Sequence, residues 1–332
     1  MDAVMNITNS DILVTGGAGF IGSNLCEALL SQGNRVTCMD NFATGKIENI
    51  AHLLKDDNFA LSEGDIRNID NCRKAVEGCT LVLHQAALGS VPRSVDDPLT
   101  TNEVNVSGSL NMLWAAKQAG VKRFVYASSS STYGDSTDKP SVEENTGFPL
   151  SPYAVSKCAN ELYAGVFAKL YGMETIGLRY FNVFGPRQDP AGAYAAAIPR
   201  FIRALMDGKA PVIYGDGTQT RDFTYVENVV QANQLAALTT NPKAIGKVYN
   251  IACGQRIELN AVVQMIKSEL TEHLPDLARI EPQYTEERPG EVKHSLASVS
   301  RAKELLNYHP HFDFQRGLKH YIAWFLRQEK IG

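Results

Sequence analysis

The sequence predicts an α/β protein in which a doubly wound parallel sheet is followed by a smaller mixed α/β C-terminal lobe. Short apolar runs, typical of buried strands, alternate with amphipathic helical patterns through the first half of the chain. This alternation is typical of a parallel sheet that is covered by helices on both faces. A glycine-rich turn follows the first strand pattern, at the edge where such a sheet binds ligands. The length of 332 residues is sufficient for two lobes.

The composition is that of an ordinary globular protein and excludes several classes of function. The chain is 44% hydrophobic and 20% charged, with a formal net charge of -4. It contains no basic run or basic helix, so nucleic acid is not an expected partner. No apolar run is long enough to span a membrane, and the first residues lack a signal-peptide pattern. We therefore expect a soluble, cytoplasmic protein with no membrane association.

The cysteines predict neither a disulfide framework nor a metal centre. None forms a C-x-x-C pair, and none lies near a histidine at the spacing of metal ligands. We expect reduced thiols, as in intracellular enzymes. The six are Cys26, Cys38, Cys72, Cys79, Cys158 and Cys253.

The secondary-structure patterns can be placed along the first half of the chain. Buried strands are predicted at 11–15, 34–39, 80–84, 123–127 and 175–180, and a further strand-like stretch ends at Asp65 and Ile66. Helices are predicted after the glycine turn, at 105–120 and at 153–171, the last two being closed by glycines.

The pattern changes after Asn182, where Gly, Pro and Ala loops surround shorter elements. Helices are predicted at 198–206, 226–238 and 259–270, a last helical stretch begins at 300–306, and a hairpin-like turn lies at 215–217. We divide the chain into a first domain over 1–182, onto which residues about 223–250 pack back, and a second lobe over 183–332.

The glycine-rich turn has the spacing of a dinucleotide site. Gly16, Gly19 and Gly22 permit a tight bend, close approach of backbone N–H groups to a pyrophosphate, and close packing of the helix on the sheet. The next strand ends at Asp40, which is placed to accept hydrogen bonds from the adenosine ribose and to repel a 2′-phosphate. These features predict a Rossmann-type domain that binds NAD rather than NADP. Asp65 is a weaker candidate to meet the adenine amino group.

A tyrosine and a lysine carry the candidate chemistry. Tyr153 and Lys157 are four residues apart at the start of a helical pattern, which places both on one face. A nearby ammonium lowers the pKa of a tyrosine from about 10 toward neutrality, so we expect Tyr153 to act as a base. Upstream, a serine run at 128–131 leaves a buried strand at the ligand-binding edge, where a hydroxyl can bond the reacting group.

The glycine turn, the strand that ends at Asp40, the serine run and the Tyr153–Lys157 pair follow one another in the order found in the extended short-chain dehydrogenase/reductase family. The chain resembles this family along nearly its whole length. The sequences LRYFN at 178–182, YGDGTQTRDF at 214–223 and RPGE at 288–291 are similar to UDP-sugar 4-epimerases. The segments HQAALGSVPRS at 84–94 and GAYAAAIPRF at 192–201 most resemble bacterial UDP-N-acetylglucosamine (UDP-GlcNAc/UDP-GalNAc) 4-epimerases.

This resemblance implies a role for each matching residue. Tyr153 takes the place of the catalytic acid and base, Lys157 that of the lysine that binds the nicotinamide ribose, and Ser129 that of the catalytic serine. The implied NAD-binding positions are Gly16, Gly19, Phe20, Ile21, Gly22, Asp40, Asn41, Asp65, Ile66, Gln85, Asn105, Tyr153 and Lys157. The implied substrate-binding positions are Gly89, Ser90, Ser129, Ser130, Tyr153, Asn182, Arg221, Arg288 and Ser295.

Two further expectations follow from the resemblance. A tyrosine at the position of Ser295 would confine such an enzyme to unacetylated UDP-hexoses, so the small serine favours UDP-GlcNAc and UDP-GalNAc. The family also forms homodimers through two long helices per subunit, which correspond to 105–120 and 153–171.

The expected reaction is the NAD-dependent 4-epimerisation of a UDP-hexose through a 4-keto intermediate, and three alternatives stay open. A nucleotide-sugar 4,6-dehydratase has an Asp-Glu pair after its catalytic serine or threonine, where this chain has Ser130 and Ser131. The sequence excludes a UDP-glucuronate-acting enzyme less firmly than it excludes the dehydratase. An NAD-sensing or scaffold protein of the same fold is expected to have lost Tyr153 or Lys157, and both are present.

Overall fold

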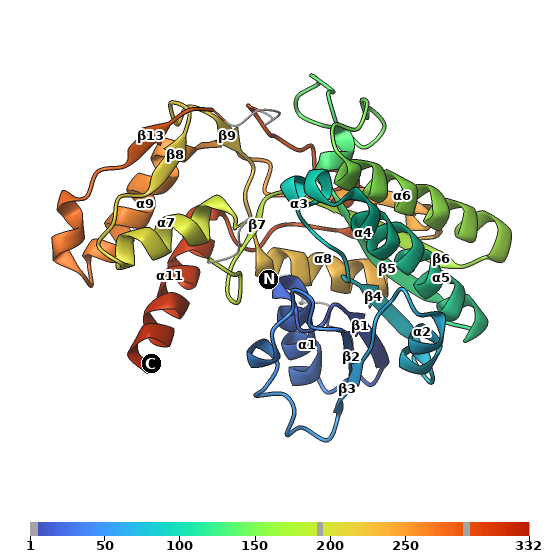
Figure 1. Ribbon diagram of the computed structural model, residues 1–332. Helices are drawn as coiled ribbons and strands as arrows, with labels where there is room; N and C mark the ends of the chain where they lie inside the picture. Colours follow the sequence, from blue (N-terminus) through green and yellow to red (C-terminus); the bar gives the residue numbers. More distant parts are fainter. Residues whose placement is uncertain (1–5, 191–194, 288–292, 332) are drawn as a thin grey trace.

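A seven-stranded parallel sheet forms the centre of the computed structural model, which describes residues 6–190, 195–287 and 293–331 (Figure 1). The strand order is β11-β6-β5-β4-β1-β2-β3, and every neighbouring pair runs parallel. The strands are β1 (Asp11–Thr15), β2 (Arg35–Asp40), β3 (Phe59–Glu63), β4 (Leu81–His84), β5 (Arg123–Ser129), β6 (Glu174–Tyr180) and β11 (Lys247–Ile251).

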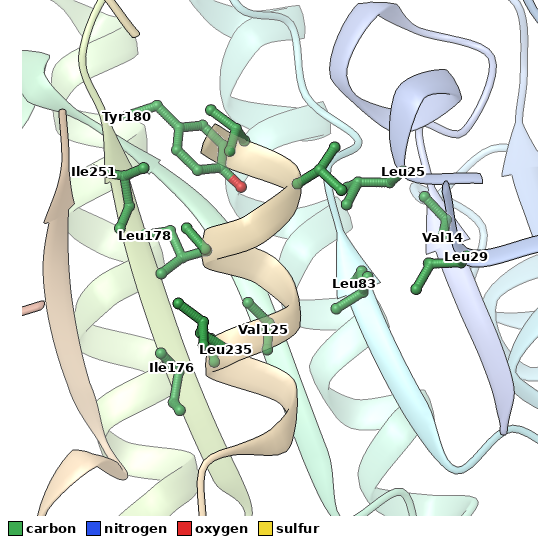
Figure 2. Packing of buried hydrophobic residues seen from close by; sticks show 14 of the residues in the cluster. Val14, Leu25, Leu29, Leu83, Val125, Ile176, Leu178, Tyr180, Leu235 and Ile251 are labelled. Carbon is green, nitrogen blue, oxygen red and sulfur yellow. The ribbon is translucent and has the colours of Figure 1, made fainter. Parts of the chain in front are cut away.

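Helices cover both faces of this sheet. They are α1 (Phe20–Ser31), α2 (Ile69–Val76), α3 (Val91–Asp96), α4 (Pro98–Asn102), α5 (Ser109–Gln118), α6 (Pro152–Tyr171) and α8 (Val226–Leu238). α1 and α8 lie on one face, where Leu25, Leu29 and Leu235 share an apolar core with side chains of the strands (Figure 2). α2, α5 and α6 enclose a second core on the other face. This is the doubly wound α/β fold that the alternating pattern predicts.

A smaller C-terminal region adds its own core beside the sheet. Its helices and strands are β7 (Val183–Phe184), α7 (Ala197–Met206), β8 (Val212–Tyr214), β9 (Thr220–Arg221), β10 (Thr224–Tyr225), β12 (Ile257–Glu258), α9 (Leu259–Thr271), β13 (Gln283–Thr285), α10 (Ser300–Leu306) and α11 (Phe314–Ile331). Phe184 lies at the centre of an aromatic cluster, with ring centroids 5.3 Å from Phe314 and 5.6 Å from Tyr225. The region therefore has an independent packing centre, although α10 packs with α8 in the core of the main sheet, to which β11 belongs.

The order of the strands places a crevice at the carboxyl ends of β1 and β4. The chain first builds outward through β2 and β3 and then returns to add β4 on the other side of β1. Open α/β sheets bind ligands at such a point of reversal, because the loops that leave the two strands diverge there. The glycine turn after β1 and the segment after β4 meet at this crevice.

The structure corrects three expectations about local elements. The turn at 215–217 does not join a hairpin, because β8 pairs with β13 and β9 pairs with β12. The last helical stretch is two helices, since Asn307 adopts a left-handed conformation that ends α10 before α11 begins. The helix predicted at 105–120 is interrupted, because Glu103–Gly108 forms a π-helical segment ahead of α5.

Two smaller findings concern the thiols and the membrane. All six cysteines are free. Within the described ranges, no helix combines the length and the apolar character that a bilayer span requires.

Asp222 ties together three separate segments of the chain. Its fully buried carboxylate accepts hydrogen bonds from the N–H groups of Cys253 and Gly254, after β11, and from Ala297, each at 3.1 Å. Burial raises the pKa of Asp222 to about 6, while the N–H donors lower it. The side chain is therefore ionised at neutral pH and holds the C-terminal loops on the end of the sheet.

We expect Asp222→Asn to lower the free energy of unfolding at neutral pH by about 1–3 kcal/mol, because the amide presents a donor to buried N–H groups.

The pKa of Asp222 in the folded protein lies above the usual 3.8, so the folded protein takes up a proton before the unfolded chain does as the pH falls. The stabilising contribution of wild-type Asp222 should therefore grow as the pH falls from about 7 toward 4. Chemical denaturation at two pH values measures both effects. The exposed Asp57→Asn variant is the control, and equal stability of Asp222→Asn and wild type would contradict this role.

Candidate functional site

The turn between β1 and α1 leaves the start of a helix open to a ligand. Gly16 has a φ of +65°, and a Cβ on Gly22 would lie 2.1 Å from the carbonyl oxygen of Gly16. Glycine is therefore required at both positions. Gly19 precedes α1, no side chain caps the helix, and its first turn, which begins with Phe20 and Ile21, contains no acid. An uncapped helix N-terminus with close backbone approach fits the pyrophosphate of a dinucleotide.

Asp40 at the end of β2 fixes this turn from the opposite side. Its carboxylate accepts hydrogen bonds from the N–H groups of Ala18 at 2.9 Å and Phe42 at 2.8 Å. A carboxylate has roughly four acceptor sites, so it can bond ribose hydroxyls while it keeps both of these contacts. The structure therefore gives Asp40 a local role that the sequence did not predict, and it leaves the ribose role as a prediction.

The expected adenine end is formed by the loops after β2 and β3. Asn41 donates a hydrogen bond to Asp65 at 3.0 Å, and Arg67 forms an ion pair with the same carboxylate at 2.7 Å. The Arg67 guanidinium holds the pKa of Asp65 below its usual value. Ile66 is buried beside Gly108, where a Cβ would lie 2.6 Å from the isoleucine side chain. Asp65 is therefore already paired within the chain.

Gln85 and Asn105 fix the segment that follows β4. Gln85 accepts a hydrogen bond from the Tyr180 hydroxyl at 3.1 Å and donates one to Asn233 of α8 at 3.2 Å. The buried Asn105 accepts from the N–H of Leu88 at 2.8 Å and donates to its carbonyl oxygen at 3.2 Å. Asn105 thereby holds the backbone of the segment after β4, and Gln85 links that segment to the side chains of Tyr180 and Asn233.

His84 is a buried histidine that the sequence analysis did not assign. Its Nδ1 lies 2.7 Å from the Thr15 hydroxyl, and its Nε2 lies 2.9 Å from the Ser109 hydroxyl. Burial first, and then the charge of Lys157, lower the pKa of His84 to about 3. The imidazole is therefore neutral at pH 7 and links β1, β4 and α5 rather than acting as a base.

Tyr153 and Lys157 lie on the first turns of α6. Ser151 caps this helix by accepting a hydrogen bond from the N–H of Ala154, at 3.1 Å. The Lys157 Nζ lies 5.8 Å from the centroid of the Tyr153 ring and donates to the Ala127 carbonyl oxygen of β5 at 2.8 Å. Burial lowers the pKa of Lys157 to about 8, so the ammonium is charged at neutral pH.

The structure corrects the expected pKa of Tyr153. Burial raises it above the usual 10, and a hydrogen bond with Ser129 partly offsets this rise. The expected lowering by Lys157 is wrong for the protein alone, because its ammonium is bonded to the strand and lies beside the ring rather than at the hydroxyl. Proton transfer from Tyr153 therefore depends on what Ser129 and a bound cofactor place next to its oxygen.

The serine run forms the rim of the site where β5 ends. Ser129 is the last residue of the strand, and Ser130 begins the short 3-10 helix Ser130–Tyr133. Ser128 points the other way and donates a hydrogen bond to Glu161 at 2.5 Å. Only alternate residues of a strand share one face, which explains why adjacent serines have different partners.

A buried ion pair behind these serines was missed by the sequence analysis. Arg179 of β6 and Glu161 of α6 form a bidentate pair with distances of 2.7 and 2.8 Å. The Glu161 charge also raises the pKa of Lys157 against the effect of burial. The available signal was the spacing, since Glu161 follows Lys157 by four residues and therefore lies on the same helix face.

Three of the residues expected to bind substrate, Asn182, Arg221 and Ser295, lie in segments that contact one another. Asn182 donates to the carbonyl oxygen of Asp222 at 2.9 Å and lies 3.5 Å from the Ser295 hydroxyl. Ser295 bonds through its N–H to the carbonyl oxygen of Thr220, the neighbour of Arg221 in β9. Arg288, the fourth expected residue, lies outside the described residues.

Gly89 and Ser90, two more of the expected substrate residues, lie after β4. Ser90 caps α3 by accepting a hydrogen bond from the N–H of Arg93 at 3.2 Å. Gly89 is exposed, and open space surrounds the position of a Cβ. Their role toward a substrate stays a prediction.

Comparisons with known proteins agree with this architecture. The model of the NAD dependent epimerase/dehydratase family matches residues 12–252. The structure of UDP-N-acetylglucosamine 4-epimerase from Methanobrevibacter ruminantium M1, in complex with UDP-N-acetylmuramic acid, is 39% identical. It aligns with a TM-score of 0.90 over 97% of this chain and 100% of that chain.

Two curated relatives extend the comparison. A putative UDP-glucose 4-epimerase of Methanocaldococcus jannaschii is 37% identical, over 94% of this chain and 97% of its own length. A UDP-glucuronate 4-epimerase of Thermodesulfobacterium geofontis is 33% identical, over 94% and 95% respectively. Because the family model covers most of the chain, including the glycine turn and the start of α6, these similarities show that the chain belongs to the NAD-dependent epimerase/dehydratase family.

Proposed function

We propose that this protein is a UDP-sugar 4-epimerase that uses bound NAD and prefers UDP-GlcNAc and UDP-GalNAc. The observation that carries the proposal is Tyr153 at the start of α6, hydrogen-bonded with Ser129 and with the Lys157 Nζ 5.8 Å from the centroid of its ring. This arrangement provides one acid–base group that can face the sugar hydroxyl. Three of the relatives that align with nearly all of the chain are named as 4-epimerases.

Each residue then has a defined task. Held by the glycine turn of Gly16, Gly19 and Gly22 and by Asp40, NAD would supply the hydride acceptor for C4 of the sugar and the hydride donor for its opposite face. Tyr153, aided by Ser129, takes the proton of the 4-hydroxyl and gives it back after the 4-keto sugar has turned. Lys157 contributes a positive charge over the Tyr153 ring and fastens the start of α6 to β5. Asn182 and Arg221 hold the diphosphate, for which the guanidinium fork is well suited, so the sugar turns without leaving.

The preference for acetylated sugars rests on Ser295. Its half-buried side chain lies beside Asn182 and is far smaller than a tyrosine, which would fill the same space. We therefore expect room for a 2-acetamido group, which Gly89 and Ser90 would contact from the segment after β4. UDP-glucose and UDP-glucuronate remain the competing substrates, since relatives named for them are 37% and 33% identical to this chain, close to the 39% of the UDP-GlcNAc 4-epimerase.

The serine run favours epimerisation over elimination. A 4,6-dehydratase needs an acid and a base near C5 and C6 of the sugar. Ser130 and Ser131 stand where that subfamily carries its Asp-Glu pair, and a hydroxyl with an ordinary pKa cannot replace a carboxylate as a base at neutral pH.

We further propose that the protein is a homodimer that associates through α5 and α6. Several large apolar side chains on α4 and α6 are exposed: Leu99, Leu162 and Leu170 are 77%, 73% and 71% accessible. Trp114 of α5 and Tyr171 of α6 add aromatic surface nearby, with ring centroids 6.1 Å apart. An apolar patch of this kind marks an interaction site, and the implied two-helix dimer would cover it.

We expect the purified protein to interconvert a UDP-sugar and its 4-epimer without added cofactor. Tyr153→Phe should reduce turnover by a factor of about 10² to 10⁴, because it removes the only hydroxyl that serves both proton transfers. Chromatographic separation of the epimers measures the rate, and mass spectrometry of the nucleotide released on denaturation identifies NAD. Near-wild-type turnover by a folded Tyr153→Phe protein would refute the assignment. A 4-keto-6-deoxy product would favour the dehydratase instead.

We expect Ser295→Tyr to suppress epimerisation of UDP-GlcNAc by about tenfold or more while turnover of UDP-glucose survives, because the ring occupies the acetamide space. Parallel assays on the two substrates give the ratio of kcat/KM values. Ser295→Thr is the matched control, since it keeps the hydroxyl and adds one methyl group. An equal loss on both substrates would point to misfolding, and unchanged UDP-GlcNAc turnover would remove Ser295 from the specificity.

We expect Leu162→Glu to convert a dimer into a monomer, because the new charge would be buried without a partner in the interface. Size-exclusion chromatography with light scattering reports the mass. Leu54→Glu is the control, since Leu54 is exposed and belongs to neither α5 nor α6, so its substitution should leave the dimer intact. A wild-type monomer, or a Leu162→Glu protein that is still dimeric, would contradict the proposed interface.

A further inference from the structure

Ser129 is held on one side by another residue of the serine run. Both the backbone N–H and the hydroxyl of Ser131 donate to the Ser129 Oγ, at 3.2 and 2.9 Å. A serine hydroxyl has one proton and two lone pairs. Ser131 therefore occupies both lone pairs, and the Ser129 oxygen can take part in any further hydrogen bond only as a donor.

Tyr153 is the group on which this donor acts. The tyrosine is the other hydrogen-bond partner of Ser129, and that hydrogen bond lowers its pKa against the effect of burial. A donated hydrogen bond stabilises a phenolate, whereas an accepted one stabilises the neutral phenol. The direction of the Ser129 hydroxyl thus decides whether this contact helps or hinders the ionisation of Tyr153.

We propose that Ser131 is a positioning residue that fixes the direction of the Ser129 hydroxyl, so that Ser129 always donates to Tyr153 or to the sugar oxygen that reacts with it. The proposal deepens the function proposed above and rests on it. Ser131 itself need not touch substrate or cofactor, and its effect is transmitted through the Ser129 oxygen.

The surrounding turn is rigid enough to hold Ser131 in place. Thr132 donates to the Ser129 carbonyl oxygen at 2.8 Å, and the N–H of Gly134 donates to the Ser131 carbonyl oxygen at 3.1 Å. Gly134 has a φ of +54°, and a Cβ there would lie 1.9 Å from the carbonyl oxygen of Phe148. The chain therefore closes against the loop behind it, and the two donors of Ser131 have little freedom to turn away.

The first measurement is the ionisation of Tyr153 itself. It is followed as the ultraviolet difference between each holoenzyme and the same protein carrying Tyr153→Phe. In Ser131→Ala the Ser129 hydroxyl regains a free lone pair, so the pKa of Tyr153 should rise by roughly half to one unit. Ser131→Thr keeps the hydroxyl and should restore the wild-type value. The acidic limb of the kcat profile should shift in the same direction, with kcat reduced about three- to tenfold and KM unchanged.

Thr132→Val is the matched control. It removes a hydroxyl from the same turn, but one that bonds to the Ser129 backbone rather than to its side chain. We expect it to lower thermal stability and to leave the Tyr153 pKa in place. A purely structural role for Ser131 would give the same result for Ser131→Ala, and that outcome would overturn the proposal.

The two levels of inference can fail separately. An unshifted Tyr153 pKa in Ser131→Ala, in a wild type that epimerises UDP-sugars, overturns the role of Ser131 alone. A shifted pKa in a protein that turns over no UDP-sugar supports the orientation of Ser129 and overturns the proposed function. If Ser131→Ala causes no additional loss of activity when it is combined with Ser129→Ala, Ser131 acts through Ser129.

Discussion

The contact on which the site depends is the hydrogen bond from the Lys157 ammonium to the carbonyl oxygen of Ala127. It fastens the first turns of α6 to the carboxyl end of β5, in a buried position where a charged group without partners would be costly. This contact joins α6 to β5 and so brings together Tyr153, one turn before Lys157, and Ser129, two residues after Ala127. The Glu161–Arg179 pair, one turn further along α6, joins the helix to β6 in the same way.

The dinucleotide turn depends on a different constraint, which is steric. α1 lies so close to the end of β1 that the space for a side chain at Gly22 is taken by the backbone of Gly16. This close packing directs the first N–H groups of the helix toward the crevice, and Asp40 keeps the loop from moving by accepting two backbone N–H bonds. The cofactor side of the site is therefore formed mainly by backbone, and the reactive side mainly by side chains.

The two sides meet because the C-terminal segments are held against the end of the sheet by buried polar groups. Asp222 collects N–H donors from separate loops, and Asn250 of β11 connects Tyr133, Ser141 and Ser298. Buried polar networks of this kind specify one arrangement, because a shifted loop would leave donors or acceptors unpaired. Asn182 and Ser295 face each other as a result, although more than a hundred positions separate them in the chain.

The sequence by itself determined the doubly wound sheet, most of its strands, the glycine turn and the pairing of Tyr153 with Lys157, because these depend on local periodicity and on spacing within one element. Tertiary structure decided what depends on partners distant in the chain. The parallel pairing of β8 with β13 replaced the expected hairpin, and burial reversed the expected shift in the Tyr153 pKa. The spacing of Glu161 from Lys157 indicated its helix face but not its bidentate contact with Arg179 of β6. The two donors that fix Ser129 come from Ser131, only two residues away, and they depend on the turn that follows β5. Sequence spacing says which residues share a face, whereas the direction of a hydrogen bond and the cost of burial are set by the atoms that fold around it.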